Sequence, residues 1–288
     1  MSNQQQKETY IIDLPSDSSY EIYKNNTLSK FSVYLPETIK LNTDYEVALG
    51  QIIYPSSIFN IPYDMNIKYK VKFKNEESTV VNKIVKKGCY HSEEDLINTI
   101  KDLFNEIKSV DIVKYMKIKY PNPSFTVIDL PKITFEKNII NCTNGELKIS
   151  RKDKEDYAKI FIQFDEYLLH MLGFEDSQLP ELGKAKYNVD MYGQIHTMYV
   201  YTDIMQPSIV GHKKANVLRV VALDSPLSSK FNSMKCEHYN APLFHSLKIL
   251  NFDTIEIQLL DSRGNLIQFE NGKVIVTLIL KPINYSKF

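Results

Sequence analysis

The chain has 288 residues, of which 43% are hydrophobic and 24% are charged, and this balance excludes wholesale disorder because it supplies enough apolar surface for a core. Its 35 basic and 35 acidic residues give a formal net charge of zero, so the basic excess of a dedicated nucleic-acid-binding protein is absent. This length suits one large β domain or two smaller domains.

The cysteines and the first residues indicate where the protein is made. Cys89, Cys142 and Cys236 are odd in number and widely spaced, which argues against a disulfide framework and favours a reducing compartment. Residues 1–8 are polar and do not form a signal peptide, and no apolar run is long enough to cross a bilayer. We therefore expect a disordered N-terminal arm over residues 1–8 on a protein that has no membrane span and is made inside a cell.

Strand-like segments follow the arm. Leu28–Leu35 and Tyr45–Tyr54 flank a short polar turn, and Asn66–Lys74 alternates strictly between lysine and apolar side chains. One face of this third segment must be buried and the other must face water. The lysine face is either a stripe that binds anions or an ordinary solvated sheet face, and the second interpretation is favoured.

Two segments have the pattern of helices. Ser92–Lys108 begins with an N-cap serine and acidic residues, and its apolar residues then recur at helical spacing. This amphipathic helix is expected to cover the protein's own core rather than to bind a partner. Asp165–Leu172 is a second, shorter helix that Gly173 terminates.

Further strands are expected in the C-terminal half. Met198–Ile204 and Val217–Leu223 come first, and Ile255–Leu259 alternates between apolar and polar residues. Val274–Leu280 is apolar on both faces apart from Thr277, which is typical of a central strand that is covered on both sides or buried in an interface.

The familiar catalytic motifs are absent from the sequence, and nine glycines leave little material for a loop that cradles phosphate. Cys236, His238 and His245 are the best candidate metal ligands, but a structural zinc site needs four ligands and no second close pair completes one. His91 and His170 are interpreted as packing or surface residues. We expect no enzyme activity, no catalytic residues, no cofactor and no metal.

Several segments, in order, carry a family resemblance. They are Asn26–Phe31, Leu35–Ile39, Tyr45–Leu49, Tyr54–Ile61, Gly88–Tyr90 with Leu96–Asn98, Leu172–Phe174, Tyr199–Ile204 with Pro207–Gly211, and Phe269–Val276. The series resembles the minor capsid, or penton, proteins of Polinton (Maverick) elements and of related adintoviruses and virophages, from about residue 16 to 282. Cys89 departs from the family, which often has an aromatic residue there. Ile112–Tyr157 does not align with the family, so the resemblance implies nothing about that stretch.

The resemblance implies a structural virion protein that forms pentamers at the five-fold vertices of an icosahedral capsid, beside trimers of a separate major capsid protein. The expected fold is all-β and mainly antiparallel, a jelly-roll β-sandwich with helical insertions over residues 9–288, and the helix-containing insertion spans roughly 88–190. The protein would be made in the host cytoplasm or nucleus, with no specific nucleic-acid binding. A five-fold ring needs two different patches on each subunit. We assign one of them to Tyr199, Tyr201, Asp203, Pro207 and Ile209, for which the alternative is a core strand followed by an ordinary proline loop.

Two other functions stay open. A hexon-like major capsid protein is disfavoured because a double jelly roll normally needs a longer chain. A soluble β-sandwich module that binds a ligand such as a carbohydrate is not excluded by the sequence. Solution mass separates the three, since a penton is a pentamer, a hexon-like protein is a trimer, and a binding module is usually smaller.

Overall fold

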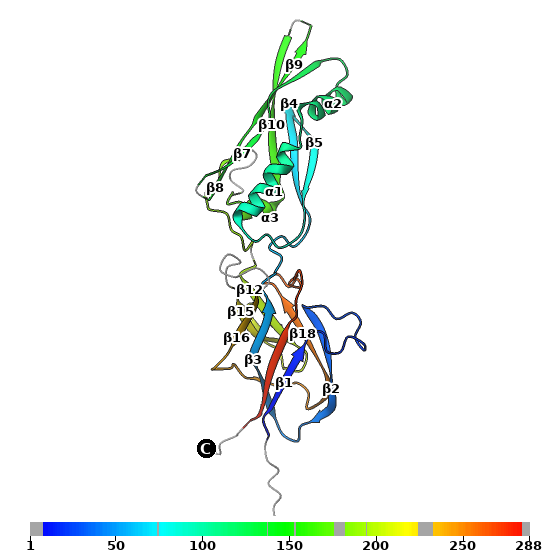
Figure 1. The fold of residues 1–288 in the computed structure, drawn as a ribbon, viewed down its shortest axis with the longest axis vertical. Coiled ribbons are helices and arrows are strands. Elements are labelled where there is room, and N and C mark those ends of the chain that lie inside the picture. The colour runs from blue at the N-terminus through cyan, green and yellow to red at the C-terminus, as the bar shows by residue number, and fades with distance from the viewer. Residues whose placement is uncertain are drawn as a thin grey trace, which may run out of the picture. The chain divides into compact units, whose positions relative to one another are not determined.

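A computed structural model of the chain (Figure 1) describes residues 8–283 except 74, 137, 153, 176–181, 194 and 224–232. Contacts divide the chain into two compact units, Met1–Phe59 with Ile195–Phe288, and Asn60–Gln194. The second unit is thus a contiguous segment inserted into the first. It starts at Asn60, well before the boundary near residue 88 that we expected. The arm expected over residues 1–8 lies outside the described residues, apart from Glu8.

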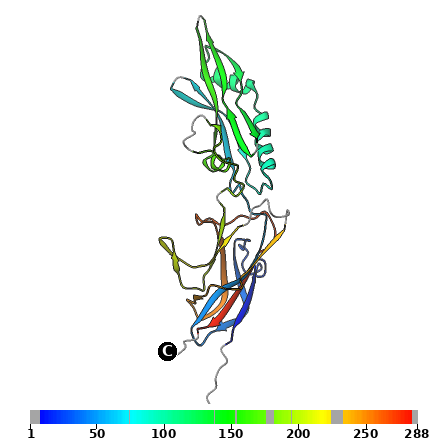
Figure 2. The same ribbon diagram turned by 90° about the vertical axis from the view of Figure 1, so that its left-hand side faces the viewer.

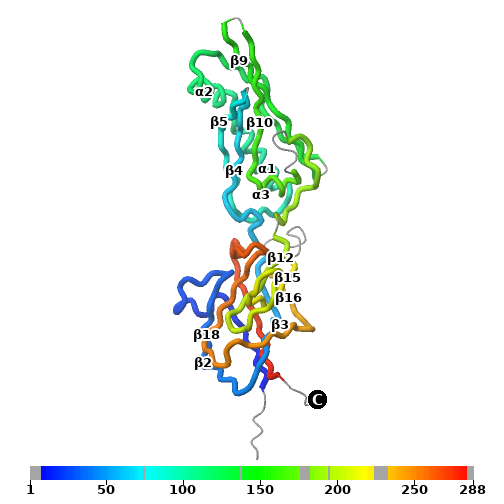
Figure 3. The backbone as a smooth tube through the Cα atoms, turned by 180° about the vertical axis from the view of Figure 1, so that it is seen from behind, coloured from blue at the N-terminus to red at the C-terminus, as the bar shows by residue number. Residues whose placement is uncertain are grey.

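The first unit is a sandwich of two antiparallel sheets. One sheet has the order β1 (Tyr10–Pro15), β19 (Ile275–Pro282), β3 (Tyr45–Pro55) and β16 (Met234–His238), and the short β17 (His245–Ser246) also pairs with β3. The other has the order β15 (Val217–Ala222), β12 (Thr197–Thr202), β18 (Asn251–Leu260) and β2 (Lys30–Lys40). Figure 3 shows this unit from behind, with β2, β18, β12 and β15 of the second sheet and β3 and β16 of the first labelled.

The strand order defines the topology of this sandwich. If its eight main strands are counted along the chain, one sheet reads 1-8-3-6 and the other reads 5-4-7-2. The first and last strands therefore pair with each other, and the connections repeatedly cross between the sheets. This is the arrangement of an eight-stranded jelly roll. The predicted fold class, a mainly antiparallel all-β jelly roll, is confirmed.

Alternating apolar residues build the core between these two sheets. In β19, Val276, Leu278 and Leu280 are fully buried, and the intervening side chains are partly exposed. β18 contributes Ile255, Ile257 and Leu259 in the same way. Each such side chain stabilises the fold by about 1.5–3 kcal/mol when it leaves water. β19 lies between β1 and β3, which confirms the central position that its apolar pattern predicted. Its outer face is partly exposed, so within this chain the strand is not covered on both sides.

The second unit has a sheet of its own (Figure 2). Its order is β5 (Glu76–Val85), β4 (Met65–Phe73), β10 (Lys154–Phe164), β9 (Gly145–Arg151) and β6 (Ser124–Asp129). A smaller sheet has the order β11 (Gly183–Lys184), β8 (Ile139–Thr143) and β7 (Lys132–Glu136). The helices are α1 (Glu93–Asn105), α2 (Ser109–Lys119) and α3 (Glu166–Met171). A two-stranded hairpin, β13 (Ser208–Val210) with β14 (Lys213–Ala215), belongs to the first unit.

Helix α1 covers the core of the second unit, as its amphipathic pattern predicted. The Ser92 side chain accepts a hydrogen bond from the Asp95 amide and caps the first turn. The buried face of α1 includes Ile100 and Phe104. The Phe104 ring contacts the Tyr69 ring of β4 edge-on, with 5.4 Å between the ring centres. Figure 2 shows α1 running alongside the strands.

Strand β4 shows how alternation assigns the two faces of a sheet. Ile67, Tyr69 and Val71 are buried in the core of the second unit, and the lysines between them point the other way. Two of those lysines, Lys70 and Lys72, lie 3.7 and 3.8 Å from carboxylate oxygens of Glu77 on β5. The described part of the lysine stripe is thus a solvated, partly neutralised sheet face, and Lys74 lies outside the described residues.

Candidate assembly interface

Two of the predicted interface residues lie on the outer face of a jelly-roll sheet. In β12, Met198, Val200 and Thr202 are buried, whereas the alternate residues Tyr199 and Tyr201 are partly exposed. The expectation of two outward tyrosines therefore agrees with the geometry of this strand.

Tyr199 is part of an apolar row that crosses the sheet. It is aligned with Val220 on β15 and with Leu260 on β18, and cross-strand partners share a face. Val220 is 46% exposed, which is high for a β-branched apolar residue on a sheet. Nothing in the described part of the unit covers this side chain fully, so the row is a surface on which another chain could pack.

The row gives way to a polar hollow at the end of β12. A depression of about 300 Å³ is lined by Tyr201, Thr202, Asp203, Asn216, Glu256 and Gln258. The Glu256 amide donates a 2.9 Å hydrogen bond to Oδ1 of Asp203, and Nε2 of Gln258 donates to Oε1 of Glu256 at 2.6 Å. The hollow thus presents two carboxylates held by hydrogen bonds.

The Asp203 carboxyl has an altered acidity. Partial burial raises its pKa above the usual value, and the neighbouring negative charge of Glu256 raises it further. The backbone hydrogen bond from Glu256 opposes this shift. A cation placed in the hollow by another chain would favour the ionised carboxylate and thereby gain binding energy.

The β13–β14 hairpin carries the other two predicted residues. Pro207 precedes it, and Ile209 is 79% exposed, the largest exposed fraction among the described large hydrophobic residues. Val210 pairs with Lys213, so Gly211 and His212 form a two-residue turn, and Gly211 has a φ of 60° that favours glycine. The hairpin joins neither sheet of the jelly roll. A lone two-stranded hairpin is marginally stable, which makes it a good candidate for contact with another chain.

The base of the hairpin is firmly attached to the jelly roll. Nδ2 of Asn216 donates to the Met205 carbonyl at 3.0 Å, and the Gln206 amide donates to the Ser246 carbonyl at 2.9 Å. Asn216 also lines the hollow that contains Asp203. Asn216 therefore holds the base of the hairpin and also forms part of the hollow.

Four of the five predicted interface residues thus occupy two adjoining features, and Tyr199 lies in the apolar row beside them. Tyr201 and Asp203 line the hollow, whereas Pro207 and Ile209 belong to the hairpin that starts beside it. The sequence prediction missed Glu256, although the alternation in Ile255–Leu259 already placed it on the outer face. It also missed Asn216, for which the sequence held no signal. Whether the five residues contact another subunit stays a prediction.

The candidate metal ligands do not form a site. Cys236 and His238 do share a face of β16, and Sγ of Cys236 accepts from Nε2 of Gln51 at 3.3 Å. Nε2 of His245 instead lies 3.1 Å from the Leu218 carbonyl. Among the residues that the structure describes, no group of three or more His, Cys, Asp or Glu side chains is arranged to hold a metal ion.

A thiol and an imidazole meet in the segment before α1. Sγ of Cys89 and Nδ1 of His91 are 3.6 Å apart, and the backbone amide of His91 donates to the Asp95 carboxylate at 3.4 Å. The pair has two of the groups that nucleophilic catalysis uses. That hydrogen bond engages the backbone of His91 and not its ring, so it does not orient the imidazole as a base.

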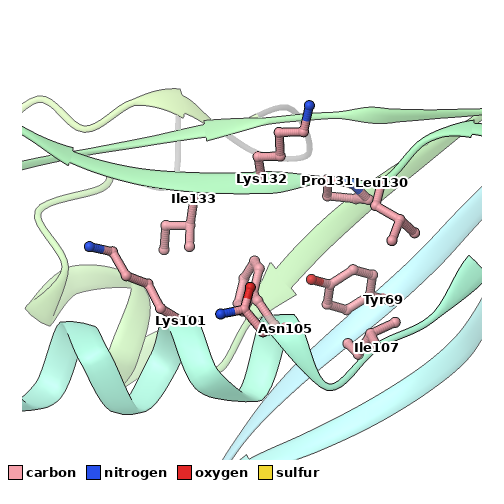
Figure 4. Close-up of a pocket in the computed structure, with 9 residues that line it drawn as sticks. Tyr69, Lys101, Asn105, Ile107, Leu130, Pro131, Lys132 and Ile133 are labelled. Atoms are coloured by element: carbon pink, nitrogen blue, oxygen red, sulfur yellow. The ribbon is translucent and has the colours of Figure 1, made fainter.

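A small cleft lies in the second unit, between the end of α1 and β7 (Figure 4). Its volume is about 380 Å³, and its lining includes Tyr69, Phe104, Ile107, Pro131 and Ile133. Figure 4 shows Ile133 pointing toward α1 and Lys132 pointing away from it. Burial raises the pKa of the Tyr69 hydroxyl, so this group stays neutral. Its lining mixes apolar side chains with the polar groups of Tyr69, Lys101, Asn105 and Lys132, and we assign it no ligand.

The fold defines the class of protein: a single jelly roll with a second unit of antiparallel strands and helices inserted in the chain between β3 and β12. Within the described ranges, no helix is long and apolar enough to cross a membrane. No family model and no curated protein matches the chain.

Structure comparison aligns the chain with two viral proteins among the solved structures. The crystal structure of selenomethionine-labelled mavirus penton protein aligns with a TM-score of 0.46 and 9% identity, covering 96% of this chain and 100% of that one. A chain of the Sputnik virophage structure, determined by cryo-EM, aligns with a TM-score of 0.41 and 11% identity, covering 98% and 99%. The jelly-roll assignment itself rests on the strand order of the present chain.

Proposed function

We propose that this chain is a structural virion protein, a penton-type subunit of which five copies form a ring at each five-fold vertex of an icosahedral capsid. The observation that carries the proposal is the 1-8-3-6 and 5-4-7-2 strand order, because jelly rolls with this order are building blocks of viral capsids. The ordered segments between about residues 16 and 282 that resemble penton proteins support it independently. The protein would be made in the host cytoplasm or nucleus and would act without catalytic turnover.

The hexon-like alternative is disfavoured by the topology of the second unit. A double jelly roll would repeat the same strand order in its other half. The described strands of Asn60–Gln194 instead form a sheet of order β5-β4-β10-β9-β6, with helices between them. The neighbours in the capsid would then be trimers of a separate major capsid protein.

We assign the contact between ring neighbours to the hairpin of one copy and the outer face of β12 on the next. A five-fold ring uses heterologous contacts, in which two different patches meet. The hairpin presents Ile209 beside the exposed Lys213 and Lys214, whereas the hollow presents Asp203 and Glu256. Glu256 lies 3.8 Å from Lys30 of its own chain, so the negative charge of the hollow is partly neutralised. The remaining opposite sign of the two patches favours correct pairing over unspecific association.

The test is the mass of the full-length protein in solution. Light scattering over a range of concentration and salt is expected to show a pentamer. A protein that stays monomeric throughout, and that does not enter particles when mixed with its major capsid protein, overturns the proposal. A trimer would indicate the hexon-like alternative, and binding of a ligand by a stable monomer would indicate the β-sandwich binding module.

The contact is tested by Ile209→Asp and Tyr201→Ala. Burying the exposed part of an isoleucine is worth about 1–2.5 kcal/mol at each contact, and a ring contains five such contacts. The matched control is Ile118→Asp, because Ile118 is 74% exposed on α2 of the second unit. Pentamers should be lost in Ile209→Asp and kept in the control. If both interface variants form rings as the wild type does, the assigned contact is wrong. The proposal that the protein forms pentamers would not be affected.

A further inference from the structure

A second cleft lies at one end of the inserted unit. Its volume is about 600 Å³, and it is lined by Lys119, Tyr120, Pro121, Asn122, Pro123, Arg151 and Lys152. This volume lies in the range of small-molecule sites. Three of the seven lining residues are cationic and none is acidic.

Three separate parts of the second unit build this cleft. Lys119 is the last residue of α2, the two prolines belong to the connection from α2 to β6, and Arg151 ends β9 where it pairs with the start of β10. Because proline fixes its own φ angle, Pro121 and Pro123 hold one wall in a set shape. The cleft is therefore preformed on one side, which lowers the entropy cost of binding.

The cleft lies at the end of the second unit that is remote from Asn60, where the chain enters. β4 leads away from that residue, and its nine residues extend about 30 Å. β10 runs antiparallel to β4, so its first residues lie beyond the far end of β4. Figure 1 shows β9 and the start of β10 at this end.

The positive charge in the cleft is only partly neutralised by its surroundings, where the Tyr120 hydroxyl donates to Glu76 at 2.7 Å. Lys119 is partly neutralised, because its Nζ lies 3.6 Å from Glu76 and it also donates to Ser78. Arg151 and Lys152 make no ion pair with any described residue. Arg151 lies over the Phe73 ring at 5.7 Å, an arrangement that leaves the edge of its guanidinium available.

The flanking lysines differ from Arg151 and Lys152, because both flanking lysines are paired with carboxylates. Lys148 pairs with Glu155 at 2.6 Å, and Lys154 lies 3.9 Å from Asp156. The free positive charge is thus confined to one spot and does not form a stripe. A nucleic-acid groove needs such a stripe, because it follows a backbone with many phosphates. A confined site fits a ligand with one or two anionic groups.

We propose that this distal cleft binds an anionic saccharide, in which a sulfate or carboxylate pairs with Arg151 and Lys152 and a sugar ring packs against Tyr120 and the prolines. The guanidinium supplies paired donors that match such an anion, and the walls supply apolar contact for the ring. The proposal concerns the second unit alone and does not rest on pentamer formation.

The test uses the full-length protein with two probes, a heparin-derived sulfated tetrasaccharide and a sialylated trisaccharide, by titration calorimetry at low and at physiological salt. The variant is Arg151→Ala with Lys152→Ala. The matched control is Lys101→Ala with Lys132→Ala, which removes two charges from the smaller cleft of the same unit. Losing two charge-assisted contacts is expected to weaken binding roughly tenfold or more, whereas the control keeps the affinity of the wild type.

Further variants keep the test decisive if the double variant folds poorly. Lys152→Glu reverses a charge on an exposed turn and should abolish binding, and Arg151→Lys should weaken it because the paired donors are lost. Four results overturn the proposal: no binding of either probe to the wild type, equal affinity in the double variant, equal binding of the desulfated tetrasaccharide, or tighter binding of a single-stranded oligonucleotide of the same charge. Inorganic sulfate that binds as tightly as the tetrasaccharide would also overturn it, since the sugar would then contribute nothing.

Discussion

Gly173→Ala should destabilise the inserted unit while leaving the jelly roll unchanged. Gly173 ends α3 with a φ of 85°. Its amide donates to the His170 carbonyl and the Phe174 amide to the Leu169 carbonyl, which are the two hydrogen bonds of a Schellman motif. A Cβ at this position would lie 2.1 Å from the Tyr187 carbonyl oxygen, whereas ordinary contact begins at 3.4 Å.

The size of the loss follows from two costs. The left-handed conformation costs alanine about 1–2 kcal/mol relative to glycine. The Tyr187 backbone must also move, which weakens the 3.0 Å hydrogen bond from its amide to the Gly173 carbonyl, worth about 1 kcal/mol. The free energy of unfolding of the second unit should fall by about 2–3 kcal/mol.

The control is Gly183→Ala in the same unit. Gly183 has a φ of 57°, but a Cβ there meets nothing within 4 Å, so only the conformational cost applies. Urea-dependent hydrogen exchange read by mass spectrometry reports each unit separately, and peptides of the jelly roll should not change because the two cores share no residue. A loss in Gly173→Ala no larger than in Gly183→Ala refutes the clash, and an equal loss in both units refutes their independence.

Three further predictions concern single side chains. Ser92→Ala should destabilise the second unit by about 1 kcal/mol because the cap of α1 is lost. Ser92→Thr keeps the cap and is the control. An unchanged urea midpoint in Ser92→Ala would contradict the prediction. Burial raises the pKa of the Cys142 thiol to about 12, so a thiol reagent at mildly alkaline pH should modify the exposed Cys236 first, and equal rates would refute it. Because the pKa of Asp203 is raised in the folded state, the wild type should lose stability relative to Asp203→Asn as pH rises above 3.8. If the difference in urea midpoint between the two proteins is the same at every pH, the prediction is wrong.

Alternation predicts the face of a strand but not its neighbours. The Asn66–Lys74 pattern correctly predicted which side chains of β4 are buried. It did not reveal that β4 pairs with β5 and β10 in a separate unit, because a period of two carries no information about hydrogen-bond partners. For the same reason the expected insertion began too late in the chain.

Helix α2 shows where periodicity fails. Only Ile112 and Met116 of this helix are buried, while Val110 and Ile118 are more than 70% exposed. Apolar residues therefore lie all round the helix, and no single apolar stripe indicated it in the sequence.

The two candidate sites differ in how far they could be predicted from the sequence. The interface residues from Tyr199 to Ile209 are close in sequence, so one segment could suggest them. Arg151 and Lys119 meet only because β9 and β6 pair and bring the end of α2 to the end of β9. No local pattern encodes that meeting, and the basic cleft was therefore not predicted.

The insertion has a consequence for the order in which the protein folds during synthesis. Residues 60–194 form one contiguous stretch with its own core, so this unit can fold as soon as it has left the ribosome. The jelly roll has to wait, because β19 is the partner of both β1 and β3 and comes last among the described strands. Tyr10 pairs with Leu280, so β1 must stay without its partner strand until almost the whole chain has been synthesised. A ribosome stalled near residue 270 would carry a finished inserted unit on an unfinished roll, with apolar strands exposed to aggregation.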